Sequence, residues 1–170
     1  RLHQQVENER LRLDAILNDS PNGMIYVDAG TGQVQANSRA EVMLDRSFTP
    51  ANGIEPLDGR FSTPDGAAVA LNTNPLSRAL QGEVITGEEY LISGPNGQDM
   101  PILSSASPIR DKTGALLGAV IRFRDITSVK EAQRQIEQEQ KRLEALVHTS
   151  PVGVFVVDAG GEVTLVNQEA

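Results

Sequence analysis

Few side chains in this sequence are of a type that performs covalent or metal chemistry. Its 170 residues include no cysteine, which excludes disulfides, thiolate metal sites and cysteine nucleophiles. The two histidines, His3 and His148, have no nearby nucleophile and no metal-ligand spacing. Glu88 and Glu89 are adjacent in a predicted strand, so their carboxylates point to opposite faces and cannot form an acid/base pair. We therefore expect no enzymatic activity and no metal site.

Candidate binding residues are also few. Gly30-x-Gly32 is weak support for a dinucleotide site, because a strand follows where a phosphate-binding helix would have to begin. Arg122 lies in the middle of a predicted strand. On a helix-covered face it could bind a carboxylate ligand; an outward orientation, favoured because arginine is seldom buried, makes it a solvated or interface residue. Tyr26 and Tyr90 could line the same cavity, although packing is the default role for both.

The elements that would position these residues follow from an internal repeat. Residues 1–40 align without a gap with residues 131–170. Each copy contains a helical pattern, then Ser-Pro-x-Gly, then a strand that ends in Asp-Ala-Gly. The chain therefore contains one whole unit and the beginning of a second. Because Arg1 is not a natural start, we interpret the chain as a fragment of a longer tandem array.

The two helices of the repeat have the same narrow apolar stripe. It contains two positions per heptad, with a glutamate (Glu9 or Glu139) in one of them, as is typical of a coiled-coil seam. A single solvated linker helix packed on its own domain is the alternative. The predicted dimer seam consists of Leu2, Val6, Leu13, Ile16, Ala132, Ile136, Leu143 and Leu146.

Between the helices, apolar residues alternate with polar ones or form short continuous runs in five segments, as is typical of strands. A short helix is predicted over 38–45 and another over 74–82, with Asn74 as its N-cap, Pro75 in its first turn and Gly82 after its end. Residues 46–74 show little periodicity. We predict an α+β fold, an antiparallel five-stranded sheet with short helices on one face, with strands at 23–29, 32–37, 84–93, 99–109 and 115–125.

Several motifs together resemble the PAS domain family. They are "VDAGTGQVQANSRA", "PLSRALQGE", "GPNGQDMPILSSASPIRDKTGALLGAV" and the "DIT" at 125–127. The resemblance spans about residues 20–127, and 150–170 looks like the start of a second PAS domain. It implies a sensory or dimerisation module in a larger signalling protein, such as a bacterial two-component histidine kinase or a diguanylate cyclase.

The resemblance also gives a role to the end of the last strand. In the family, the Asp-Ile-Thr positions fasten the sheet to the helix that follows, and here these are Asp125, Ile126 and Thr127. No glycine or proline separates strand from helix, so a shift of the sheet would have to move the helix. Ser128-x-x-Glu131 fits a capping box. We expect these residues to form a signalling junction.

These observations predict four segments and a set of partners. The segments are a signalling helix (1–19), a PAS domain (20–127), a linker helix (128–149) and a truncated second PAS domain (150–170). We expect a homodimer through the flanking helices and a downstream effector domain. The net charge of −8 argues against nucleic acid, and no apolar run is long enough to span a bilayer.

No cofactor is predicted, since there is no cysteine for a flavin adduct and no histidine within the domain for haem. Met24, Met43 and Met100 are expected to pack the core rather than to bind haem. We expect a cytoplasmic location. Two other functions stay open: a small-molecule receptor with its ligand between the sheet and residues 74–82, and a structural spacer.

Overall fold

The computed structural model describes residues 4, 5, 7, 11, 12, 15, 17–49, 51–94, 96–149, 152, 153 and 155–166. The chain divides into two compact units, residues 1–127 and 128–170, and each is described here by itself. The first unit contains the sheet and its covering helices. The second contains most of a long helix and a hairpin.

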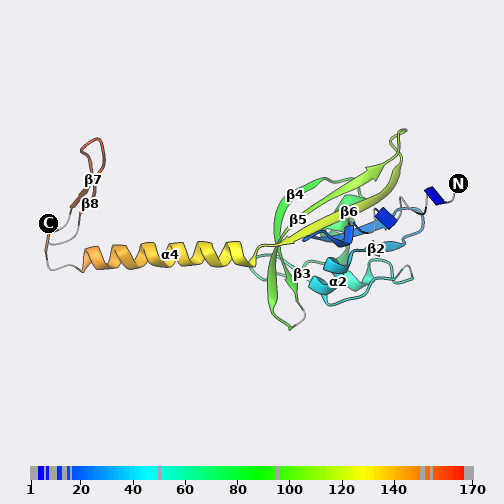
Figure 1. Cartoon of the computed structure of the whole chain (residues 1–170), viewed down its shortest axis with the longest axis horizontal. Coiled ribbons are helices and arrows are strands. Elements are labelled where there is room, and N and C mark those ends of the chain that lie inside the picture. The colour runs from blue at the N-terminus through cyan, green and yellow to red at the C-terminus, as the bar shows by residue number, and fades with distance from the viewer. Residues whose placement is uncertain are drawn as a thin grey trace. The chain divides into compact units, whose positions relative to one another are not determined.

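The first unit is built on one antiparallel sheet (Figure 1). The strands lie in the order β2-β1-β6-β5-β4-β3, so the first and last long strands of the domain, β1 and β6, are neighbours near the centre. The strands are β1 (Gly23–Asp28), β2 (Val34–Ala36), β3 (Phe61–Ser62), β4 (Ile85–Ser93), β5 (Asp99–Arg110) and β6 (Leu116–Asp125).

The prediction of five strands is wrong by one. The sixth, β3, is only two residues long and pairs with Ile92 and Leu91 of β4 at the edge of the sheet. A strand this short cannot display a period-2 pattern, which is why residues 46–74 showed none. The second strand also begins later than predicted, because Gly32 adopts φ +69° in the preceding turn.

Short helices cover one face of the sheet. The helix α2 (Ser38–Leu44) packs on β1, and α3 (Pro75–Leu80) packs on β5 and β6. Each begins at an asparagine whose side-chain oxygen accepts a backbone N–H: Asn37 from Ala40, and Asn74 from Ser77. The predicted N-cap of α3 is thus confirmed. Two 3₁₀ turns, η1 (Glu55–Leu57) and η2 (Leu71–Thr73), complete the covering layer.

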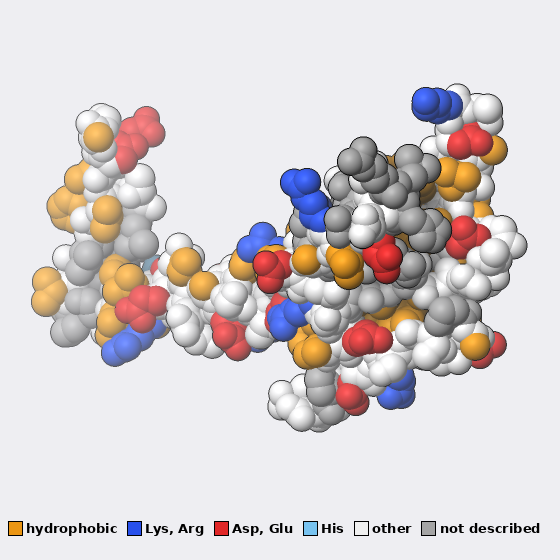
Figure 2. Space-filling model, turned by 45° about the vertical axis from the view of Figure 1, so that its right-hand side comes forward, with side chains coloured by type: hydrophobic (Ala, Val, Ile, Leu, Met, Phe, Trp, Pro, Cys, Tyr) orange, Lys and Arg blue, Asp and Glu red, His pale blue; other side chains and the backbone are white. Residues whose placement is uncertain are grey.

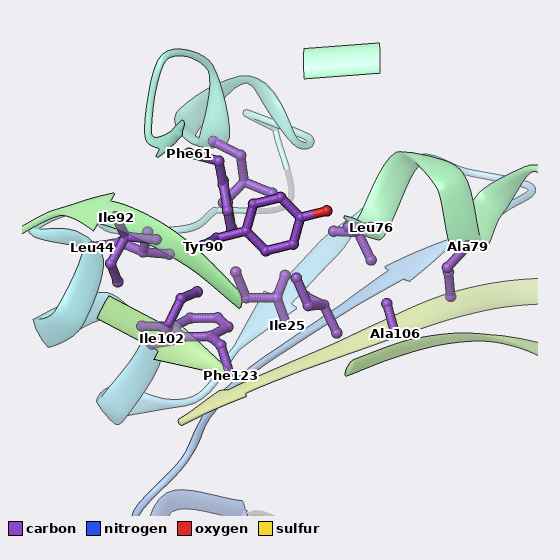
Figure 3. Packing of buried hydrophobic residues seen from close by; sticks show 14 of the residues in the cluster. Ile25, Leu44, Phe61, Leu76, Ala79, Tyr90, Ile92, Ile102, Ala106 and Phe123 are labelled. Atoms are coloured by element: carbon purple, nitrogen blue, oxygen red, sulfur yellow. The ribbon is translucent and has the colours of Figure 1, made fainter. Parts of the chain in front are cut away.

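The core lies between these helices and the sheet (Figure 3). Alternate residues of the central strands point into it, among them Ile25 on β1 and Ile121 and Phe123 on β6, all fully buried. We call this helix-covered side the inner face and the opposite side the outer face. Met43 is in the core and Met100 packs against it, as expected. The same prediction is wrong for Met24, which is half-buried on the outer face because it alternates with the buried Ile25.

The second unit has little burial of its own. The helix α4 (Thr127–His148) has no buried residue, and the hairpin of β7 (Phe155–Val157) and β8 (Val163–Val166) exposes the side chains that the structure describes. Figure 2 shows hydrophobic side chains at the surface of this unit. Within the described part of the chain, no helix is both long enough and apolar enough for a bilayer crossing.

Candidate functional site

The first candidate site is the junction between β6 and α4. The strand ends at Asp125, the helix begins at Thr127, and only Ile126 lies between them. Ile126 is 7% exposed, and its amide donates to the carbonyl of Pro101 on β5 at 3.0 Å. The Asp125 carboxylate accepts the amide of Thr127 at 2.8 Å, which satisfies one of the free amides at the helix start. The predicted fastening by Asp125, Ile126 and Thr127 therefore has a direct structural basis.

The capping box predicted from Ser128 to Glu131 is not formed. Since Thr127 is already helical, Ser128 lies inside the first turn rather than at the cap position. Among the described residues, no hydrogen bond joins the Ser128 hydroxyl to the Glu131 amide or the Glu131 carboxylate to the Ser128 amide. Asp125 caps the helix instead, because it precedes the helix and its carboxylate accepts the Thr127 amide.

Asn37 forms an equivalent attachment for the N-terminal helix, which was not predicted from the sequence. Its side-chain nitrogen donates to the carbonyl oxygens of Leu17 (2.8 Å) and Asn22 (3.0 Å). Its side-chain oxygen accepts the amides of Met24 (2.9 Å) and Ala40 (3.0 Å). The residue is 6% exposed. The repeat contained the signal, because the aligned position, 167, is also asparagine.

The two attachments lie at the same end of the central strand pair. The chain enters β1 at Gly23, and Gly23 pairs in register with Phe123, two residues before the end of β6. A change in the spacing or twist of β1 and β6 would therefore reach the attachments of both flanking helices.

The seam residues can be followed only in α4. Leu2, Val6, Leu13 and Ile16 lie outside the described residues. In α4, Ala132, Ile136, Leu143 and Leu146 are exposed, with Ile136 at 61% and Leu143 at 54%. Together with Val129 (52% exposed) and Glu139 they form a stripe with the 3-4 spacing of a heptad. The dimer seam remains a prediction.

The structure separates the three residues predicted to bind a ligand. Tyr90 lies on the inner face, 8% exposed, with its ring edge-on to Phe61 at 5.9 Å between centroids. Tyr26 and Arg122 lie on the outer face, where Tyr26 is half-buried and Arg122 exposed. Arg122 thus has the outward orientation that we favoured. One cavity shared by Tyr26 and Tyr90 is wrong, because the sheet lies between them.

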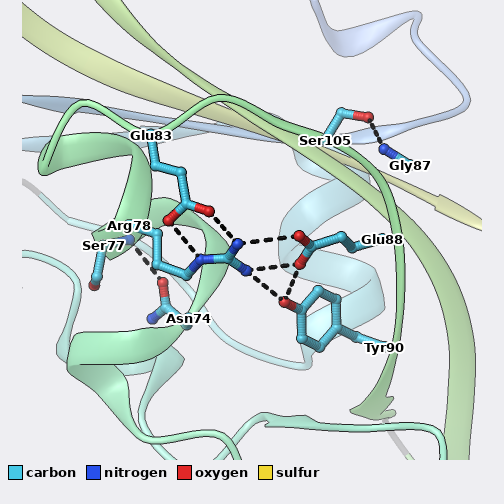
Figure 4. A network of polar contacts seen from close by, with 8 residues as sticks. All are labelled: Asn74, Ser77, Arg78, Glu83, Gly87, Glu88, Tyr90 and Ser105. Atoms are coloured by element: carbon cyan, nitrogen blue, oxygen red, sulfur yellow. Dashed lines mark hydrogen bonds and ion pairs between the residues drawn. The ribbon is translucent and has the colours of Figure 1, made fainter.

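The inner face instead has a polar network centred on Arg78 of α3 (Figure 4). The guanidinium forms two hydrogen bonds with Glu83 and two with Glu88, the latter at 2.7 and 3.0 Å. Tyr90 donates to the Glu88 carboxylate at 2.6 Å and accepts from Arg78 at 3.1 Å. Since Glu88 and Tyr90 belong to β4, the network fastens α3 to the sheet.

This network shifts the ionisation of its members. Hydrogen bonds from Arg78 hold the pKa of Glu83 and of Glu88 below the ordinary carboxyl value. Burial, followed by the Glu88 hydrogen bond, raises the pKa of Tyr90 to about 12. At neutral pH the network therefore consists of two carboxylates, one guanidinium and a neutral phenol. The guanidinium bonds both carboxylates, and the phenol donates to the Glu88 carboxylate. Sequence spacing did not predict this network, because a β-bulge between Ile85 and Glu88 lies between Arg78 and Glu88 in the chain.

Two buried polar atoms near this network have no partner. Ser104 on β5 is in register with Glu88 and is fully buried, and its hydroxyl makes no hydrogen bond among the described residues. Asn74, 1% exposed, likewise leaves its side-chain nitrogen unpaired within the part of the chain that the structure describes. Such a group usually costs about 1–3 kcal/mol, so a bound polar molecule would be favourable here.

The described residues contain no cluster of three or more histidine, aspartate or glutamate side chains that could hold a metal ion. The paired carboxylates Glu83 and Glu88 contact an arginine rather than a nucleophile.

Comparison with known proteins agrees with this fold. The "PAS fold" family model matches residues 17–131, more than half of the chain, and a second "PAS domain" model matches 141–170. No curated protein matches the sequence. Among solved structures, an RNA-binding light-oxygen-voltage receptor is 17% identical with a TM-score of 0.51, over 76% of this chain and 36% of its own.

Two isolated PAS domains are also similar. That of nitrogen regulation protein NR(II) from Vibrio parahaemolyticus is 23% identical (TM-score 0.46, 66% of this chain and 96% of that one). That of an HTR-like protein from Haloarcula marismortui is 17% identical (TM-score 0.47, 73% and 97%). Of the three structures, the light-oxygen-voltage receptor, at 17% identity, indicates a shared fold only. The family-model match over residues 17–131 establishes that the chain belongs to the PAS domain family.

Proposed function

We propose that this chain is a non-catalytic sensory PAS module that dimerises through its flanking helices and relays a change in its sheet to a downstream effector. The observation on which this proposal rests most is the β6–α4 junction. Only the buried Ile126 separates strand from helix, and its amide is bonded to the neighbouring strand at Pro101. A helix attached in this way cannot change direction without a change at the end of the sheet.

The exposed stripe of α4 supports the dimer. A helix of 22 residues with no buried side chain lacks the packing from which most protein helices gain their stability. Pairing two copies along Val129, Ile136, Leu143 and Leu146 would supply it. The effector expected downstream, beyond the second PAS domain that begins after α4, is a histidine kinase or a diguanylate cyclase domain.

Sedimentation equilibrium of the whole chain tests the dimer. Leu143→Asp places a charge in the seam and should convert a dimer to a monomer. Gln138→Asp adds the same charge on the side of the helix away from the seam and should leave the dimer intact. A monomeric parent protein, or equal effects of the two substitutions, would remove the basis for the proposal.

Hydrogen exchange tests the coupling of sheet and helix. Asp125→Ala removes the acceptor of the Thr127 amide and should speed exchange in the first turns of α4, at a cost of about 1 kcal/mol. The exchange of β5 and β6 amides is the internal control and should stay unchanged. If the α4 amides are also unchanged, Asp125 does not fasten the helix.

A small-molecule receptor is the second candidate, and the unpaired Ser104 hydroxyl and Asn74 amide favour it. A molecule with a hydrogen-bonding group could bind between the sheet and α3, within reach of the Arg78 network. Native mass spectrometry of freshly purified protein would reveal an added mass, and Ser104→Ala should reduce its occupancy. A protein without added mass that still dimerises supports a relay or spacer without a small ligand.

A further inference from the structure

The outer face of the sheet has an arginine among apolar and hydroxyl side chains. In register, Arg122 on β6 lies between Met24 on β1 and Ser105 on β5. Two residues along the strand, Val120 pairs with Ser107. Arg122 is exposed, whereas these four neighbours are half-buried. The charged group therefore stands at the surface beside side chains that are already partly withdrawn from water.

A groove lies beside a β-bulge on this face. The pairing of β4 with β5 shifts between Ile85 and Glu88, and Gly87 adopts φ +65° there. The Gly87 amide donates to the Ser105 hydroxyl at 3.1 Å (Figure 4). The groove has a volume of about 400 Å³, and its lining includes the buried, paired residues Ile85 and Ala106. It therefore extends from the surface down to the strands themselves.

The lining of the groove combines three kinds of side chain. Among the described residues that line it, Arg122 is the only charged one, and no aspartate or glutamate is present. The rest are mostly hydroxyl or apolar side chains: Thr86, Ser105, Ser107, Met24, Val84 and Val120. Such a lining complements one negative charge attached to an apolar body.

The guanidinium of Arg122 is free to accept a ligand. The ion pairs found among the described residues involve Arg78 and Arg142, and none involves Arg122. A guanidinium presents parallel N–H donors whose spacing matches the two oxygens of a carboxylate. The Ser105 hydroxyl accepts the Gly87 amide and still has its own proton to donate. The groove thus offers donors for an anion and, within the described residues, no acidic group that would repel it.

Size and charge together indicate the class of ligand. The volume of the groove lies in the range of about 300–1,000 Å³ that is typical of small-molecule sites. A phosphate group would bring roughly two negative charges against one arginine, and no second lysine or arginine is among the described lining residues. A carboxylate brings one charge, and an alkyl or aryl body would cover the apolar part of the lining.

We propose that the outer-face groove binds a small amphipathic carboxylate, with its carboxylate on Arg122 beside the Ser105 hydroxyl and its apolar body on Met24 and Val120. The site is separate from the space between the sheet and α3, because the sheet lies between the two. A ligand here would contact β1, β5 and β6 together, and β6 is the strand that continues into α4. The inference does not rest on the proposed dimer, because one chain supplies the whole groove.

Methyl NMR of the whole chain, titrated with octanoate, tests the site. We expect saturable shifts of the Met24 and Val120 methyl signals, which lie on the outer face. Two matched probes separate charge from chain: 1-octanol lacks the charge and acetate lacks the chain, so both should bind this groove more weakly. Arg122→Gln should weaken octanoate binding by roughly 10-fold and leave 1-octanol binding unchanged.

Two further variants serve as controls. Arg124→Gln should leave octanoate binding unchanged, since Arg124 is an exposed arginine two residues along β6 that does not line the groove. Val120→Thr nearly preserves the volume of the side chain but adds a hydroxyl, so it should weaken octanoate and 1-octanol alike. The methyl spectrum of each variant without ligand verifies that its fold is kept.

Three results would overturn the inference. The first is equal effects of Arg122→Gln and Arg124→Gln on octanoate binding. The second is an equal loss of octanoate and 1-octanol binding in Arg122→Gln. The third is shifts confined to the core methyls, such as those of Ile121, or to the second hairpin, such as those of Val157. Sedimentation of Leu143→Asp tests the proposed dimer separately, so the two proposals can fail independently.

Discussion

The two hairpins of this chain have closely related sequences and opposite surroundings. Residues of β1 and β2 align with those of β7 and β8 at an offset of 130, so that Ile25 corresponds to Phe155 and Val27 to Val157. Ile25 and Val27 are 0% and 3% exposed, whereas Phe155 and Val157 are 65% and 49% exposed. The same strand pattern thus forms part of a core in one place and an open apolar surface in the other.

What the hairpins share is local. Asp28 accepts the amides of Gly30 and Thr31 at 3.0 and 2.7 Å, and Asp158 accepts those of Gly160 and Glu162 at 2.8 and 3.0 Å. An aspartate at the start of a turn can satisfy these amides without the rest of a domain. Burial is different, because it requires β6 and α2, which only the first unit possesses. The hairpin sequence alone is thus enough for the hydrogen bonds of the turn, whereas burial of the strand side chains depends on the neighbouring elements.

The largest expected effect comes from truncating the aligned apolar residues. Ile25→Ala should destabilise the first unit by about 2–5 kcal/mol, because it leaves a cavity in the core. Phe155→Ala should change its stability by no more than about 0.5 kcal/mol, because Phe155 is exposed. Both tyrosines of the chain lie in the first unit and tryptophan is absent, so tyrosine fluorescence during urea unfolding reports on that unit alone. Similar effects of the two variants would contradict the comparison.

A slightly smaller effect is expected where the first hairpin contacts β6. A Cβ at Gly118 would lie 2.2 Å from the Val27 carbonyl oxygen and 2.7 Å from the Tyr26 ring. Gly118→Ala should therefore displace the two strands at a cost of about 1–3 kcal/mol. Gly30→Ala is a useful control, because the nearest atom to its added Cβ is 3.5 Å away. Urea midpoints followed by the same fluorescence would distinguish them, and equal midpoints would argue against close packing at Gly118.

Removal of the Asn37 attachment should have a moderate effect. Asn37→Ala deletes the cap of α2 and the hydrogen bonds to Leu17 and Asn22, and we expect a loss of about 1–2 kcal/mol. Faster hydrogen exchange at Asp19, whose amide is the donor to the carbonyl of Ala15, would show that the helix end has loosened too. Asn37→Asp keeps the accepting oxygen but not the donor, so it should preserve the cap of α2 and lose the contacts with Leu17 and Asn22. The prediction fails if both variants loosen α2 equally.

The smallest expected effect is a pH dependence of the first turn. Hydrogen bonds from Thr31, aided by Gly30, hold the pKa of Asp28 below its ordinary value. A folded pKa below the unfolded one stabilises the fold at pH values above the unfolded pKa of about 3.9, and this contribution is lost as the pH falls through the folded pKa. Asp28→Asn should therefore lower the urea midpoint at pH 7. Near pH 3, the midpoints of the variant and of the parent protein should differ less.

The second hairpin supplies the control for this titration. Asp158→Asn should leave the tyrosine-reported transition unchanged at every pH, because Asp158 belongs to the other unit. Two results would contradict a stabilising role of ionised Asp28 in the first unit. One is a pH-dependent change of the urea midpoint in Asp158→Asn, and the other is a difference in midpoint between Asp28→Asn and the parent that grows toward pH 3. The comparison also reveals whether the two units unfold independently.

The elements that sequence reasoning located best are those with their own local signals. Asn74 and Pro75 marked the start of α3, and the alternation of β6 could have placed Arg122 opposite Ile121 and Phe123. The two-residue β3 had no such signal. Its position depends on pairing with β4, which is a long-range property.

The functional residues divide in the same way. The Asp125–Thr127 junction was predictable because strand and helix are contiguous. The Arg78 network was not, because it joins a helix to a strand across a bulge that changes which side chains share a face. The Asn37 attachment lies between these cases, since only the repeated asparagine at position 167 pointed to it.

The common end at which the chain enters β1 and leaves β6 has a mechanical consequence. Tension applied between the N-terminal segment and α4 would act across the first hydrogen-bonded pair, near Gly23 and Phe123, before any other. The strands would then peel apart one pair at a time, as a zipper opens, rather than slide past each other with all their hydrogen bonds loaded together. Such a geometry yields at low force, so a modest separation of the two helices is enough to open the centre of the sheet from that end.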